Sequence, residues 1–96
     1  MIESFGNRLA SDLFDDRPSK EIRKFSPELR RAARRKLLYL QDATTLTDLR
    51  VPPGNRLEAL KGKLAGYHSI RINDQWRVVF QWQNGNAYNV QVLDYH

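Results

Sequence analysis

The stretch YHSIRINDQWRVVFQWQNGNAYNVQVLDYH, which spans residues 67–96, decides the fold. Apolar and polar side chains alternate along it, and this period of two is typical of half-buried β-strands. Two turn signals, Asn73-Asp74 and Asn84-Gly85, separate its β-rich runs. The stretch therefore predicts an antiparallel meander.

The lengths of the two loops set the register of this meander. Loops of three residues, 73–75 and 84–86, place apolar side chains opposite one another, whereas two-residue loops would put Phe80 opposite Asn89. Because a slip of one residue moves a whole strand to the wrong face, the apolar matching favours the longer loops. Asn-Gly pairs, in contrast, usually form two-residue turns. The expected pairs are Ile72–Trp76, Ile70–Val78, Phe80–Val90 and Val78–Val92.

The same register divides the side chains between two faces of the sheet. The even-numbered positions are expected to pack on the helices, and they are Ile70, Ile72, Trp76, Val78, Phe80, Trp82, Tyr88, Val90 and Val92. The odd-numbered positions form the other face, and they are Tyr67, Ser69, Arg71, Arg77, Gln81, Gln91 and Tyr95. Arg71 then lies directly opposite Arg77, and Tyr95 lies diagonal to Arg77. Since like charges in a cross-strand pair repel, this arrangement indicates a site for an anion.

A long helix is expected ahead of the sheet. Ser26-Pro27-Glu28 supplies a hydroxyl at the N-cap, a proline at the first helical position and an acid at the positive end of the helix dipole. The helix should run to about Ala43. Its buried stripe is expected to be Phe25, Leu29, Ala33, Leu37 and Leu40, and the basic side chains on its other faces are Arg30, Arg31, Arg34 and Arg35.

The remaining N-terminal residues complete the expected fold. Met1–Phe5 predicts a short strand, and the apolar side chains of Leu9, Leu13 and Phe14 predict an amphipathic stretch after it. The fold class is therefore α+β, with N-terminal helices packed on one face of a mainly antiparallel, curved β-sheet. The length favours a single domain, residues 1–96.

The chain is basic, with 16 Lys and Arg residues against 11 Asp and Glu residues and a formal charge of +5. Residues 17–36 hold nine basic and two acidic side chains, a local balance of +7. Residues 50–77 hold six basic and two acidic side chains, a local balance of +4. Such stripes suit polyanions such as nucleic acid, and a solvated helix face is the alternative interpretation.

Several classes of chemistry are not expected. The chain has no cysteine, which removes disulfides and Cys-based zinc sites and is compatible with a reducing cytoplasm. Without an apolar run near the roughly 18 residues of a membrane span, and without a signal peptide, we expect a soluble cytoplasmic protein with no membrane partner. The scattered carboxylates and missing nucleotide motifs predict no metal and no cofactor. His68 is expected to point into the core, and His96 is terminal.

The polar residues that remain suit cleavage of RNA without a metal. The 2′-hydroxyl needs a base, the pentacoordinate phosphate needs fixed positive charge, and the 5′ oxygen needs a proton. Arginine and lysine supply the charge at any cellular pH, and aromatic side chains stack unpaired bases. The candidate residues are Glu58, Lys61, Tyr67, Arg71, Arg77 and Tyr95. The structural alternatives are that Tyr67 merely covers the sheet and that Glu58 is a surface carboxylate.

The C-terminal half resembles the HigB-type toxins of the RelE/ParE superfamily, also known as plasmid maintenance killer proteins. The runs that carry the resemblance are RLEALKG (56–62), GYHSIRI (66–72), NDQWRVVF (73–80) and VLDYH (92–96). MIESF (1–5) and DATTLTDL (42–49) match as well, so the resemblance covers essentially the whole chain. The Leu-Lys-Gly, Trp-Arg and Asp-Tyr-His elements are specific when they occur together.

The resemblance implies a compact RelE-like fold and an mRNA endonuclease that acts on the 70S ribosome, at the 16S rRNA. It also implies neutralisation by a HigA-type antitoxin with a helix-turn-helix domain, and contact with operator DNA only through that antitoxin. Lys61 and Arg77 would contact the scissile phosphate, and Asp94, Tyr95 and His96 would form the active-site C-terminus. The RNA-binding residues would be Tyr67, Arg71, Arg30, Arg31, Arg34 and Arg35.

One position departs from the family pattern. Glu58 stands where better-known members carry a histidine, so the general base is Glu58, Tyr95 or His96. Two other functions share the fold class: a ParE-like inhibitor that binds DNA gyrase, and a module that docks on rRNA without cutting. Lys61 and the terminal Asp-Tyr-His favour the nuclease, and fold alone does not decide between these functions.

Overall fold

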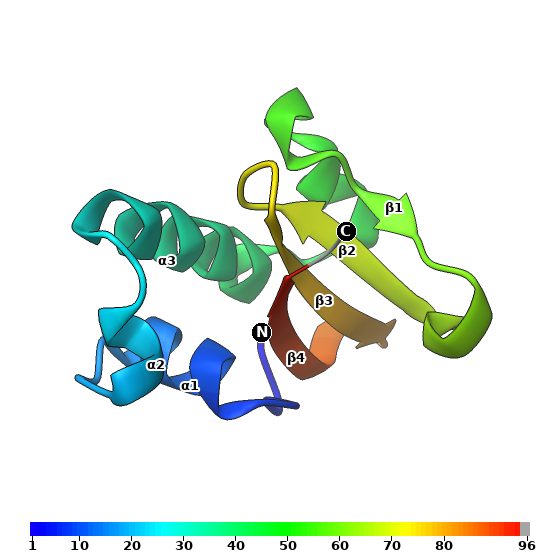
Figure 1. Cartoon of the computed structure of the whole chain (residues 1–96). Helices are drawn as coiled ribbons and strands as arrows, with labels where there is room; N and C mark the ends of the chain where they lie inside the picture. Colours follow the sequence, from blue (N-terminus) through cyan, green and yellow to red (C-terminus); the bar gives the residue numbers. More distant parts are fainter. Residues whose placement is uncertain (95–96) are drawn as a thin grey trace.

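A computed structural model describes residues 1–94, in which helices precede an antiparallel sheet (Figure 1). The helices are α1 (Arg8–Asp15), α2 (Lys20–Arg23) and α3 (Pro27–Asp42), and the short 3₁₀ turns are η1 (Leu46–Arg50), η2 (Pro53–Asn55) and η3 (Gly62–Leu64). The strands are β1 (Glu58–Ala59), β2 (Tyr67–Arg71), β3 (Trp76–Gln83) and β4 (Asn86–Asp94). They lie in the order β1-β2-β3-β4, and every neighbouring pair is antiparallel. The expected α+β class is confirmed.

The helices begin where short polar side chains cap them. The Ser26 hydroxyl accepts a hydrogen bond from the Leu29 backbone N–H at 3.1 Å, and Pro27 is the first residue of α3, as predicted. Asn7 caps α1 and Ser19 caps α2 in the same way. No helix within residues 1–94 combines the length and the apolar character that a membrane crossing requires.

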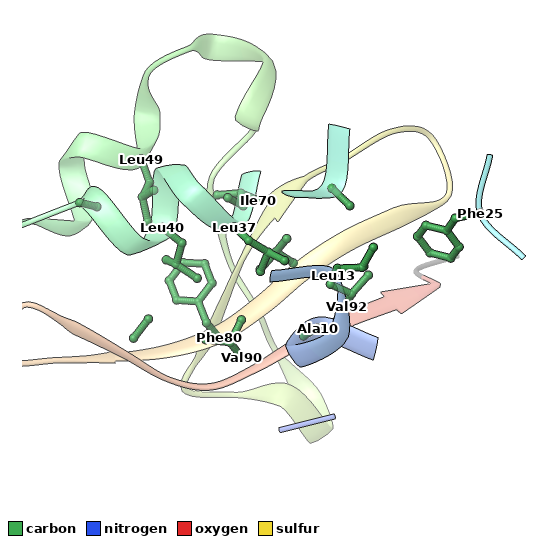
Figure 2. Packing of buried hydrophobic residues seen from close by; sticks show 14 of the residues in the cluster. Ala10, Leu13, Phe25, Leu37, Leu40, Leu49, Ile70, Phe80, Val90 and Val92 are labelled. Atoms are coloured by element: carbon green, nitrogen blue, oxygen red, sulfur yellow. The ribbon is translucent and has the colours of Figure 1, made fainter. Parts of the chain in front are cut away.

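The core lies between α1, α3 and one face of the sheet (Figure 2). The predicted stripe of α3 supplies Leu37 and Leu40, both completely buried, and Phe25 packs on Trp76 with ring centroids 4.7 Å apart. The sheet residues that meet them are Ile70, Val78, Phe80, Ala87, Val90 and Val92. Alternation along β3 therefore leaves Arg77 on the opposite face, away from the helices.

The first hairpin has the predicted register. Ile70 pairs with Val78 and Arg71 pairs with Arg77, so the loop holds the three residues 73–75. Within this loop the Asn73 side chain accepts hydrogen bonds from the backbone N–H groups of residues 75 and 76.

The second hairpin differs from the prediction of a three-residue loop. Gln83 pairs with Asn86 across a two-residue Asn84-Gly85 turn, and both turn residues have positive φ (53° and 81°), as this turn type requires. Register is restored farther along by a bulge, because Val79 pairs with Gln91 whereas Gln81 pairs with Tyr88.

The bulge changes which side chains of β4 reach the core. Two residues of β4, Asn89 and Val90, lie opposite Phe80, and Asn89 adopts the left-handed conformation with φ 52°. Ala87 consequently takes the core position, completely buried, and Tyr88 moves to the outer face beside Gln81. The assignment of Tyr88 to the helix-packed face was wrong, and the expected Phe80–Val90 pair is spread over the bulge.

The N-terminal segment closes the free edge of β4. Ile2 and Phe5 form parallel bridges to Ala87 and Val90, and the Gly6 backbone N–H donates to the Val90 carbonyl at 2.7 Å. The predicted short strand at residues 1–5 is thus present as two isolated bridges rather than as a continuous strand.

Replacing Gly6 by alanine should destabilise this edge by about 1–3 kcal/mol. An added Cβ would lie 2.7 Å from Cγ of Gln91 and 2.8 Å from the backbone carbonyl oxygen of Asn89, and the latter cannot move without disturbing the bulge. Urea denaturation should show the loss. The matched control is Gly54→Ala, whose Cβ would have no neighbour within 4 Å and which should change stability by less than about 0.5 kcal/mol. Equal effects of the two substitutions would contradict the close approach at Gly6.

Candidate active site

Arg77 is the centre of a polar group on the outer face of the sheet. Its side chain is only 12% exposed. Nη1 donates to the Ser69 hydroxyl at 2.7 Å and to the Arg56 carbonyl oxygen at 3.4 Å, while Nη2 donates to Oε1 of Glu58 at 3.2 Å. A guanidinium held at both ends in this way has a fixed orientation, which is what a phosphate-binding group needs.

Strand pairing explains why these side chains meet. Glu58 of β1 pairs with Ser69 of β2, and Arg77 lies on β3, two pairs away from the Ser69–Val79 pair. Ser69 and Val79 are both completely buried, so Arg77 crosses a dry part of the outer face to reach β1. Low local polarity strengthens the electrostatic interactions of a charge held there.

Arg71 lies opposite Arg77, as the register predicted. Each of the two arginines has its own carboxylate, because Arg71 forms an ion pair with Asp74 of the hairpin loop and Arg77 forms one with Glu58. The inference that the two adjacent cations await an external anion is therefore incomplete. Both carboxylates are more than half exposed, whereas the side chains of Arg71 and Arg77 are 31% and 12% exposed.

Two other predicted residues lie toward the other end of β2 from the Arg71–Arg77 pair. Tyr67 stands on the same face, paired with Gln81, and is half-buried. Lys61 is exposed in the loop that joins β1 to β2, two residues beyond the end of β1.

Asp94 ends β4 next to the Arg77–Leu93 pair. Oδ2 of Asp94 accepts a hydrogen bond from Nε2 of Gln75 at 2.9 Å, which ties the strand end to the first hairpin loop. Tyr95 and His96, the other two members of the predicted C-terminal triplet, lie outside the described residues.

The four arginines of α3 are not part of this group. They belong to α3, which packs on the opposite face of the sheet from Arg77. Arg30 donates from Nε to the Phe25 carbonyl at 3.1 Å, and Arg34 donates from Nε to the Phe14 carbonyl at 3.3 Å. Arg31 and Arg35, like Arg34, are exposed to solvent.

The sequence also led to expectations for His68 and for metal binding. His68 lies on the helix-packed face as expected, stacked on Phe80 with centroids 6.1 Å apart, and its buried Nδ1 has no hydrogen-bond partner. Across residues 1–94, His, Asp and Glu side chains do not gather in any group of three that would hold a metal ion.

The sequence did not predict two of the contacts of Arg77, those with the Ser69 hydroxyl and the Arg56 carbonyl. Ser69 was placed on the outer face, but nothing marked it as a partner of Arg77. The available signal was a small hydroxyl residue on the same predicted face, diagonal to the arginine. The Arg56 contact depends on the path of the loop before β1, which no periodicity reports.

The sequence of the chain matches a known toxin family. A family model described as RelE-like toxin of type II toxin–antitoxin system HigB matches residues 3–96. Toxin HigB-1 of Vibrio cholerae serotype O1 is 41% identical over 96 residues, covering 100% of this chain and 98% of that protein. Endoribonuclease HigB of Proteus vulgaris is 46% identical over 41 residues, which cover 43% of this chain and 45% of that protein.

Solved structures share the fold at low sequence identity. The YoeB–YefM complex from Staphylococcus aureus contains a chain with a TM-score of 0.62 and 17% identity, and the match covers 100% of this chain and 98% of that one. A mutant of YafQ from E. coli gives a TM-score of 0.55 at 13% identity, with 98% and 93% covered. The expected RelE-like fold is confirmed.

Proposed function

The chain belongs to the RelE-like toxin family of type II toxin–antitoxin systems that HigB represents, and on this basis we propose that it is a ribosome-dependent endoribonuclease that cuts mRNA. The observation that carries the proposal is the Arg77 guanidinium, almost buried and held by three partners on an outer face that carries further cations. The relative from Proteus vulgaris is named an endoribonuclease, which supports the same chemistry here.

The proposed reaction is an attack by the 2′-hydroxyl of the substrate on the adjacent phosphorus. A base removes the 2′ proton as the new P–O bond forms, and the bond from phosphorus to the 5′ oxygen then breaks. The products are a 2′,3′-cyclic phosphate and a 5′-hydroxyl, which receives a proton as it leaves. Arg77 stabilises the extra negative charge on the phosphorane, and Lys61 supplies a second positive charge. These residues provide the fixed charge that the reaction requires.

Three residues are candidates for the general base: Glu58, Tyr95 and His96. Glu58 is the candidate within the described residues, and its carboxylate accepts a hydrogen bond from the guanidinium that would bind the phosphate. Tyr95 and His96 remain the other candidates, and Asp94 would orient the chain end that carries them. Tyr67 offers an aromatic ring on the same face for stacking of an unpaired base.

The partners follow from the family and the charge distribution. The α3 surface with Arg31 and Arg35, together with Arg30, Arg34 and Arg71, is proposed to contact the 16S rRNA of the 70S ribosome, because clustered cations suit a phosphate backbone. A HigA-type antitoxin with a helix-turn-helix domain is the proposed inhibitor, and it would provide the contact with operator DNA. Ribosomal action implies a cytoplasmic location.

Purified protein should cut mRNA when translating 70S ribosomes are present and should leave free mRNA intact. Fixed charge and positioning are supplied by the protein, whereas the ribosome would hold the substrate in line for attack. Primer extension on one mRNA, with and without ribosomes, measures both conditions. Equal cutting of free mRNA would contradict ribosome dependence. Absence of cutting in both would refute the nuclease, and inhibition in a DNA supercoiling assay would then indicate a gyrase inhibitor.

A further inference from the structure

Two of the groups that hold Arg77 lie on a segment with little attachment to the sheet. Arg56 and Glu58 belong to the run between η2 and β2, where β1 contributes only two paired residues. Arg56 also adopts the left-handed conformation, with φ 45° and ψ 58°. For a residue with a side chain this conformation is unfavourable and persists only when neighbouring groups hold it. The groups that hold Arg56 in this conformation therefore also influence the orientation of the Arg77 guanidinium, which donates to the Arg56 carbonyl.

Asn55, directly before Arg56, anchors this run. Its side chain is completely buried. Nδ2 donates to the carbonyl oxygens of Leu49 at 3.1 Å and Val51 at 3.3 Å, and Oδ1 accepts a hydrogen bond from Nζ of Lys36 at 2.5 Å. Both ends of the amide are thus bonded, and the bond to Lys36 connects the run to α3.

Lys36 is an unusual partner for a buried amide. Burial lowers the pKa of Lys36, and the positive charges of Arg35 and Arg71 lower it further. Among residues 1–94, none of the acids lies within ion-pair distance of the Lys36 ammonium. This ammonium meets the Asn55 amide and also lies over the Tyr39 ring, 5.4 Å from the ring centroid. Of these two contacts, the bond to Asn55 is the one that joins α3 to the run before β1.

We propose that Lys36 and Asn55 are positioning residues for Arg77. Lys36 fixes the Asn55 amide, Asn55 fixes the left-handed turn at Arg56, and the turn sets the carbonyl of Arg56 and the carboxylate of Glu58 against the guanidinium. The proposal rests on the function given above, since it assigns the pair to the same site. Neither residue touches the substrate.

The test is Lys36→Met, which keeps the apolar length of the side chain and removes the ammonium. The single-turnover rate of mRNA cleavage on saturating ribosomes should fall about 10-fold, because a small misplacement of a charge-stabilising group costs that much or more. The protein should stay folded with a modestly lower melting temperature, because the buried Oδ1 of Asn55 loses its donor. The ¹⁵N–¹H resonance of Arg77 Nε should shift in the free protein. Lys36→Arg, which restores a cationic donor, should recover most of the rate.

Lys20→Met is the matched control, since Lys20 is an exposed lysine on α2 and its loss should change neither the rate nor the Arg77 resonance. The proposal is overturned if Lys36→Met leaves both the rate and the Arg77 resonance unchanged, or if it unfolds the protein. If the parent protein itself does not cut mRNA, the proposed function fails. The shift of the Arg77 Nε resonance in Lys36→Met then tests by itself whether Lys36 positions Arg77, because this measurement requires no cleavage activity.

Discussion

Replacing Arg77 by alanine should lower the rate of mRNA cleavage on the ribosome by about 10²–10³-fold. The guanidinium is fixed before substrate arrives, by Ser69, Glu58 and the Arg56 carbonyl, so little reorganisation is needed when charge develops on the phosphate. Its low exposure increases the value of each contact with that charge. Single-turnover primer extension at saturating ribosome concentration measures the chemical step separately from binding.

Arg23→Ala provides the control for this experiment. Arg23 is exposed on α2 and carries the same charge, so its removal should leave the chemical step unchanged. Arg77→Lys should recover only part of the lost rate, because an ammonium cannot reach Ser69 and Glu58 at once as the forked guanidinium does. A full rate in Arg77→Ala would remove Arg77 from the chemistry and leave it a structural role in joining β1 to β3.

The elements that depend on nearby residues could be predicted from the sequence. The start of α3 is determined by Ser26 and Pro27, and its buried stripe follows from spacing alone. The predicted register of the first hairpin was also correct, since only the three-residue loop brings Ile70 opposite Val78. In these places the local preference and the final packing agree.

The second hairpin was wrong because two local arguments conflict and a distant segment resolves them. Asn84-Gly85 favours a two-residue turn, whereas apolar matching favours a longer one. The structure accommodates both with a bulge at Asn89, whose backbone N–H donates to the Ser4 hydroxyl at 2.8 Å. Ser4 lies 85 residues away in sequence, and periodicity within the hairpin contains no information about it.

The same limit applies to the candidate site. Alternation along β3 and β2 correctly predicted that Arg77 and Ser69 share the outer face. The pairing of β1 with β2 joins residues across the η3 loop, so the contact of Glu58 with Arg77 could not be read from spacing. The hydrogen bonds of Arg30 and Arg34 to backbone carbonyls were hidden for the same reason, and helical spacing gave only their faces.

Replacing Glu58 by glutamine should lower the cleavage rate by about 10²–10⁴-fold if Glu58 is the general base, as its position beside Arg77 supports. Glutamine retains an oxygen that can accept the hydrogen bond from Nη2 of Arg77, so the setting of the guanidinium should survive. What is lost is the ability to take the 2′ proton. The single-turnover rate on ribosomes is the measurement, and a parallel spectrum of the Arg77 Nε–H group checks that the arginine has not moved.

The substitution Glu58→His distinguishes two roles of Glu58, that of general base and that of ion-pair partner of Arg77. A histidine titrates nearer to neutral pH than a carboxylate does, and a base is most effective when its pKa is close to the working pH. If Glu58 occupies the base position, histidine should therefore raise the rate above that of the parent chain even though the ion pair with Arg77 is lost. An unchanged rate in Glu58→Gln would assign proton removal to Tyr95 or His96. Glu58 would then act only as the carboxylate that holds Arg77, and histidine at this position should lower the rate instead.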